Sequence, residues 1–258
     1  MSLVFVVSLL LGSIAMFQNS LIYFPENPPL ASVLSDARRQ GLKAWPSEGD
    51  YRGLLREPAG PARGTVVLFH GNAGHAGHRD WYADEFARLG LRVILAEYPG
   101  YGSRSGKLGE AALVADAVET LALARRTFSG PLLLAGESLG AGVAAAVANN
   151  ADVAALLLIT PWDRLESIAQ YHYHWLPVGS LLRDRYDSVE NLSGYHGRVA
   201  LVIAGNDSIV PAKFGHRLFE LLSEPKRLWV VPAADHNDWM SRVDGAWWRS
   251  VIDFLIDG

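Results

Sequence analysis

Residues 131–148, "PLLLAGESLGAGVAAAVA", decide how the rest of this sequence is interpreted. An apolar run ends at Ser138, which stands between two glycines in the pattern G-x-S-x-G and is followed by alanines and valines. The apolar run predicts a buried strand, and the small residues after it predict a helix packed closely against its neighbours. A sharp turn between the two would project the serine hydroxyl above the sheet, and Gly136 and Gly140 leave room for that turn.

Strands and helices alternate on both sides of this stretch. Strand-like apolar runs lie at residues 64–71, 91–102, 131–137, 153–161, 198–205 and 226–232, and helical patterns at 78–90, 108–128, 138–150, 212–222 and 238–256. This alternation predicts an α/β fold, with a mostly parallel central sheet and helices on both faces. Residues 162–197 lack either pattern and are predicted to form a small cap insertion over one edge of the sheet.

The composition excludes several classes of protein and of site. Half of the 258 residues are hydrophobic and 19% are charged, so the chain can bury a sizeable core. A net charge of −4 without any basic block argues against nucleic acid as a partner. The absence of cysteine excludes disulfides, thiol catalysis and zinc–thiolate sites.

Residues 1–24 are predicted to be an apolar N-terminal segment, separate from a domain that spans residues 25–258 and begins with the stiff stretch "PENPP". "MSLVFVVSLLLGSIAMF" carries no charge, and the residues after it could extend it to the length of a membrane-spanning helix. We expect an uncleaved membrane anchor. Two alternatives are a signal peptide cleaved after a small-x-small site, which would leave a secreted or periplasmic protein, and a buried helix of the domain.

A serine hydroxyl becomes a good nucleophile when a histidine accepts its proton and a carboxylate orients that histidine. In folds with this type of turn the chain order is serine, acid, histidine. His236 follows the last predicted strand and is the expected base for Ser138. Asp207, on a tight turn after the preceding strand, is the expected acid, and Asp163 is the alternative. Asp235 lies so close to the histidine in sequence that we expect it to shape the loop.

Acyl transfer also requires hydrogen-bond donors for the oxyanion that develops on the carbonyl. The backbone N–H of Leu139 at the start of the helix is one expected donor, and that of Asn72 in the loop "HGNAGH" is the other. His70 is expected to support this loop from inside the protein. The glycines do not form a phosphate-binding loop, because neither G-K-[ST] nor G-x-G-x-x-G occurs here. "HYH" at 172–174 lacks the carboxylates of a metal site, so no metal is expected.

The motifs together resemble the α/β-hydrolases, and most closely the BEM46/ABHD13/ABHD17 branch of serine hydrolases. The resembling segments, in order, are "SLIYFP", "HGNAG", "EYPGYGSRSG", "GESLGAGVA", "TPWDRL", "RYDS", "GNDSIVP" and "DHNDW". The resemblance implies an α/β-hydrolase fold in which Ser138, Asp207 and His236 are nucleophile, acid and base. It also implies that the oxyanion amides belong to Asn72 and Leu139.

Two positions depart from the pattern of the family. Glu97 stands where aspartate is more common, and we expect it to have a structural role. Asp235 stands where glycine usually precedes the histidine, a change that could alter the loop or the pKa of the base.

The expected reaction is hydrolysis of a carboxylic ester or thioester through an acyl-enzyme, without a cofactor. A small acyl ester or a lipid-like molecule is the expected substrate, and the N-terminal segment would bring the protein to a membrane. Trp162, Tyr171 and Trp175 are candidates for the walls of the acyl pocket, or else belong to the core of the cap. Two alternatives remain: an amide or peptide hydrolase with the same triad, and a non-catalytic, membrane-tethered binding protein.

Overall fold

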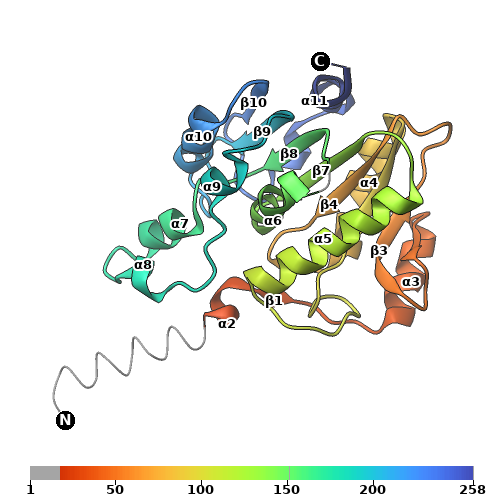
Figure 1. The fold of residues 1–258 in the computed structure, drawn as a ribbon, viewed down its shortest axis with the longest axis horizontal. Helices are drawn as coiled ribbons and strands as arrows, with labels where there is room; N and C mark the ends of the chain where they lie inside the picture. Colours follow the sequence, from red (N-terminus) through yellow and green to blue (C-terminus); the bar gives the residue numbers. More distant parts are fainter. Residues whose placement is uncertain (1–17, 151, 258) are drawn as a thin grey trace, which may run out of the picture.

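The computed structural model describes residues 18–150 and 152–257 and contains an eight-stranded sheet in that part of the chain (Figure 1). The strand order is β10-β9-β8-β7-β4-β6-β3-β2. Only the pairs β2–β3 and β3–β6 are antiparallel among the strands of this sheet. The strands are β2 (Lys43–Pro46), β3 (Tyr51–Arg56), β4 (Gly64–Phe69), β6 (Leu91–Ala96), β7 (Leu132–Glu137), β8 (Ala155–Ile159), β9 (Arg198–Ala204) and β10 (Lys226–Val231). The predicted α/β fold with a mostly parallel sheet is confirmed.

Helices cover both faces of the sheet, because its central strands are apolar on both sides. In β4 the side chains alternate between two cores: Val67 and Phe69 belong to one, and Val66 and Leu68 to the other. The first core includes residues of α5 (Glu110–Thr127), α6 (Leu139–Val147) and α10 (Ala212–Leu221). The second includes residues of α3 (Leu30–Arg39), α4 (Asp80–Arg88) and α11 (Gly245–Asp257). This two-sided burial is what a parallel sheet requires.

The insertion between β8 and β9 contains three short helices, all of them within the described residues. They are α7 (Leu165–His172), α8 (Val178–Leu181) and α9 (Ser188–Leu192). In Figure 1, α7 and α8 extend away from the sheet, whereas α9 returns to pack beside α6. The insertion lies within residues 162–197 of the sequence.

The structure differs from the prediction of one continuous helix over residues 238–256. A short 3₁₀ helix, η3 (Trp239–Arg242), is followed by a break and then by α11. Asp244 causes the break, because its carboxylate accepts a hydrogen bond from the Trp247 N–H (2.8 Å) and so caps a new helix. The strand predicted over 91–102 also ends early, at Ala96.

The domain begins earlier than residue 25. Within the described residues, α2 (Asn19–Ile22) and β1 (Phe24–Pro25) lie against the body of the protein, and Tyr23 is buried in the first core. β1 pairs with the two-residue strand β5 (Ala73–Gly74). None of the helices in the described ranges is long and apolar enough to span a membrane, and the expected anchor falls mainly on residues 1–17, outside those ranges.

Candidate active site

Ser138 occupies the sharp turn between β7 and α6. Its backbone has φ 53° and ψ −114°, a conformation that non-glycine residues rarely adopt. The turn is tight enough that a Cβ on Gly136 would lie 2.2 Å from the Gly140 carbonyl oxygen, and a Cβ on Gly140 would lie 2.0 Å from the Phe69 carbonyl oxygen. The Ser138 N–H donates to the carbonyl of Ile159 (2.9 Å), which ties the turn to β8. The serine is thereby held at the carboxyl end of the sheet.

Asp207 and His236 meet because they follow two neighbouring parallel strands, β9 and β10. His236 Nδ1 lies 2.7 Å from Asp207 Oδ2, and both side chains are buried. The other carboxylate oxygen of Asp207 accepts the backbone N–H groups of Ile209 (2.9 Å) and Val210 (2.6 Å), which fixes the direction of the carboxylate. The Ser138 hydroxyl makes no hydrogen bond to His236 in the described part of the chain; such bonds commonly tighten only when substrate binds.

Asp163, the alternative acid, has other partners. Its buried carboxylate accepts the N–H of Arg164 (2.8 Å) and the hydroxyl of Ser167 (3.2 Å), and it lies 3.4 Å from the Arg217 guanidinium. These contacts fasten the start of α7. The structure therefore brings Asp207 to His236 and uses Asp163 to hold the insertion.

Both expected oxyanion donors border one cavity with Ser138. Leu139 is the first residue of α6, and Asn72 lies in the loop after β4. His70, fully buried, contacts the Gly71 carbonyl through Nδ1 (2.8 Å) and Glu97 through Nε2 (3.1 Å). Glu97 also accepts the N–H of Ala76 (3.1 Å). His70 and Glu97 thus support the loop from inside, as the sequence analysis predicts.

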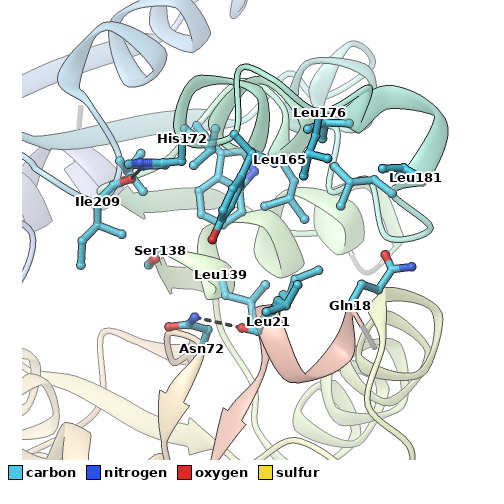
Figure 2. Close-up of a pocket in the computed structure, with 18 of the residues that line it drawn as sticks. Gln18, Leu21, Asn72, Ser138, Leu139, Leu165, His172, Leu176, Leu181 and Ile209 are labelled. Atoms are coloured by element: carbon cyan, nitrogen blue, oxygen red, sulfur yellow. Dashed lines mark hydrogen bonds between the residues drawn. The ribbon is translucent and has the colours of Figure 1, made fainter. Parts of the chain in front are cut away.

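The cavity has a volume of about 400 Å³ and is lined mostly by apolar side chains, with Ser138 and Leu139 at one side (Figure 2). Trp162 and Trp175 are among the lining residues. Trp162 is buried and its indole donates to the Tyr186 carbonyl (3.2 Å), whereas Trp175 is 64% exposed. The apolar walls suit a hydrocarbon group beside the serine.

Tyr171 does not line this cavity, contrary to the prediction. Its ring lies against Phe214 and 4.2 Å from the Lys213 ammonium group. The reason is the phase of α7, whose cavity-facing residues recur with the helical period and leave Tyr171 on another face. The lining residues of α7 are Leu165, Ile168, Ala169 and His172. The sequence analysis found no helical pattern in residues 162–197, so neither α7 nor its cavity-facing side was predicted.

Other lining residues were not predicted at all. Gln18, Leu21 and Ile22 come from the N-terminal part of the described chain, and Ile209 and Val210 follow the acid. His172, part of the "HYH" stretch, bonds the Ile209 carbonyl (2.8 Å). The described residues contain no group of three or more histidine, aspartate or glutamate side chains arranged to hold a metal ion.

Asp235 connects the acid loop to the base loop. Its Oδ1 accepts the N–H of Ser208 (2.8 Å), the hydroxyl of Ser208 (2.8 Å) and the N–H of His236 (2.7 Å). Hydrogen bonds hold the pKa of Asp235 below its ordinary value of 3.8; the bond from the Ser208 N–H has the largest effect and the bond from the His236 N–H the next largest. Asp235 therefore cross-links the two loops as an anion.

We predict that Asp235→Asn lowers the melting temperature at pH 7. A lowered folded-state pKa means that the carboxylate stabilises the fold above pH 3.8, and that this contribution is lost as the pH falls through the lower, folded-state value. The difference from the unsubstituted protein should therefore shrink in acid. Melting curves from pH 3 to pH 8 test this, with Asp50→Asn as a control for loss of an exposed charge. A difference that persists unchanged in acid would contradict the assignment.

Comparison with known proteins agrees with the fold and the motifs. Residues 60–185 match the family described as serine aminopeptidase, S33. The uncharacterized protein Rv2307c of Mycobacterium tuberculosis is 37% identical over 253 residues, which cover 90% of this chain and 86% of that protein. The protein bem46 of Schizosaccharomyces pombe is 28% identical over 79% of this chain and 71% of its own.

Solved structures show the same architecture. The ferulic acid complex of Est1E from Butyrivibrio proteoclasticus superposes with a TM-score of 0.65 at 16% identity, over 79% of this chain and 94% of that one. Together with the sequence relatives, the fold and the glycine-flanked serine turn lead to one conclusion. The chain is an α/β-hydrolase and belongs to the branch of that superfamily that includes bem46.

Proposed function

We propose that this protein is a serine hydrolase that cleaves carboxylic esters or thioesters through an acyl-enzyme. The observation that carries the proposal is the serine on a strained turn, open to an apolar cavity, at the sheet edge where His236 and Asp207 are hydrogen-bonded. Asp207 would hold His236 Nδ1–H and so keep Nε2 free to act as a base. No step in this chemistry requires a cofactor.

The reaction would proceed in two halves. His236 takes the proton of Ser138 as Oγ attacks the carbonyl carbon, and the carbonyl electrons move to the oxygen, which the amides of Leu139 and Asn72 stabilise. Collapse of this intermediate expels the alcohol or thiol, which receives the proton from His236. Water then attacks the acyl-enzyme with His236 as base, and the acid and free Ser138 are released.

The cavity supports a small-molecule ester with an apolar acyl group as substrate. Its volume of about 400 Å³ lies within the range of small-ligand pockets. The side chains beside the serine carry few polar atoms, so a charged or peptide-like acyl part would lose hydrogen bonds to water without replacement. The apolar walls therefore favour a hydrocarbon-bearing ester or thioester over a peptide, whose cleavage would use the same triad.

Ser138 should react with a fluorophosphonate probe, and the purified protein should hydrolyse p-nitrophenyl acyl esters much faster than the matching p-nitroanilides. Ser138→Ala should abolish labelling and lower kcat about 10⁴-fold or more, because the nucleophile is lost. Measuring both reactions separates the hypotheses. Faster anilide cleavage would favour the amidase, and an unlabelled, inactive but folded protein would favour the non-catalytic binding protein.

Asp207→Asn should lower kcat by about 10⁴-fold, because the amide can no longer hold the histidine in the required tautomer. Asp163→Asn provides the matched control, since it alters a second buried aspartate at the same end of the sheet that contacts Arg164, Ser167 and Arg217 instead. We expect it to destabilise α7 while the protein that remains folded keeps its turnover. Equal kinetic losses in the two variants would argue against Asp207 as the acid.

We also propose that the N-terminal segment attaches the protein to a membrane. Residues 1–17 are uncharged, and they lead into Leu21, which is 58% exposed at the cavity together with Trp175. The full-length chain should therefore sediment with membranes and be released by detergent but not by high salt. An N-terminus that starts after Ala15 in the mature protein, with the activity in the soluble fraction, would instead support signal cleavage and export.

A further inference from the structure

Residues 18–25, here called the N-terminal strap, hold the peptide groups around Asn72. The Asn72 side chain donates from Nδ2 to the Ile22 carbonyl (2.9 Å), a bond drawn in Figure 2, and the Phe24 N–H donates to the Asn72 carbonyl (2.8 Å). The hydroxyl of Tyr101 donates to that same carbonyl (2.8 Å). The side chain and the carbonyl of Asn72 are thus fixed together, which leaves its own N–H little freedom to turn. Two of these three bonds come from the strap.

The other side of the strap is bonded to the insertion. The Tyr23 hydroxyl donates to Asp184 Oδ2 (2.6 Å) and lies 3.0 Å from the Tyr186 hydroxyl. Gln18 accepts the N–H of Arg183 (2.9 Å) through its side-chain oxygen. Burial, followed by the bond to Asp184, raises the pKa of Tyr23 far above its usual range, so this phenol stays a neutral donor. The strap therefore bridges the cap and the oxyanion loop.

The strap is also part of the cavity wall. Gln18, Leu21 and Ile22 line the same cavity as Ser138, and Figure 2 shows Gln18 and Leu21 on the side facing the insertion. A single segment thus contacts both the place where an acyl chain would lie and the loop that would carry the second oxyanion donor. Nothing in the proposed acyl-transfer chemistry itself requires such a connection.

We propose that the N-terminal strap positions the oxyanion donor, with Tyr23 and the side chain of Asn72 as positioning residues that keep the Asn72 N–H aimed at the reacting oxygen. This inference rests on the proposed function. An oxyanion donor contributes only when its aim is right, and complete loss of one costs about 10²–10³ in kcat. Loosening the donor without removing it should cost less, about tenfold.

Asn72→Ala tests the first half of the proposal, because it removes the bond to Ile22 and leaves the backbone N–H in place. We expect kcat for a p-nitrophenyl ester to fall about tenfold with little change in KM. The affinity for a boronic acid, which forms a tetrahedral adduct with the serine, should fall by a similar factor. Asn27→Ala is the matched control, since Asn27 Nδ2 bonds the carbonyls of Gly100 and Gly102 away from the cavity.

Tyr23→Phe tests the second half and removes a single oxygen atom. Tyr195→Phe is its control, because that buried phenol donates to the Val153 carbonyl (3.1 Å) and neither residue lines the cavity. We expect both variants to lose some thermal stability, but only Tyr23→Phe to lose turnover and boronic acid affinity in parallel. This isosteric change carries the test even where Asn72→Ala folds poorly.

Two results would overturn the inference. One is that Asn72→Ala and Tyr23→Phe turn over the ester as fast as their controls, Asn27→Ala and Tyr195→Phe, when each variant and its control have the same melting temperature. The other is that turnover falls while boronic acid affinity does not, which would place the defect outside the oxyanion site. Failure of the proposed function would look different, because the unsubstituted protein and both controls would then also lack ester hydrolysis and labelling of Ser138.

Discussion

The Phe69 carbonyl leaves no room for a side chain at Gly140, and the rest of the site depends on this close approach of α6 to β4. Because the helix passes directly over the strand end, the chain must reverse within one residue, and Ser138 takes the strained conformation there. The small residues that follow allow α6 to be buried along almost its whole length. The same contact that strains the serine thus anchors it beside a buried helix.

Parallel pairing extends this arrangement to the acid and the base. Strands β7, β8, β9 and β10 are neighbours that run in one direction, so the loops after them gather at one edge. Hydrogen bonds between loops then replace sheet pairing as the source of order. The Ser138 N–H bonds Ile159, His236 bonds Asp207, and Asp235 bonds the Ser208 backbone. The first bond ties the turn after β7 to the end of β8, and the other two join the loop after β10 to the loop after β9.

The features that could be predicted from the sequence are those that follow from local pattern and strand order. The flanking glycines predict that Ser138 lies on a sharp turn after a strand. The order of the strands predicts that Asp207 and His236 lie in the loops after the last two strands. The direction of Tyr171 could not be predicted, since it depends on which face of α7 meets the cavity. The role of the strap was equally hidden, because Tyr23 and Asp184 are 161 residues apart and no periodicity connects them. The break before α11 was not predicted either, although aspartate, here Asp244, is a preferred residue at the start of a helix.

The site therefore has two parts of different rigidity. The turn that carries Ser138 is called the nucleophile half, and the loop that carries Asn72 is called the oxyanion half. The nucleophile half is fixed by backbone packing in the core, where a displacement would require α6 and β4 to separate. The oxyanion half is fixed by single hydrogen bonds: Asn72 donates to Ile22 and accepts from Phe24 and Tyr101, and His70 contacts the Gly71 carbonyl from inside. Each such bond contributes about 1 kcal/mol. Local opening of such a segment costs less than global unfolding. The strap is therefore expected to open more easily than the serine turn.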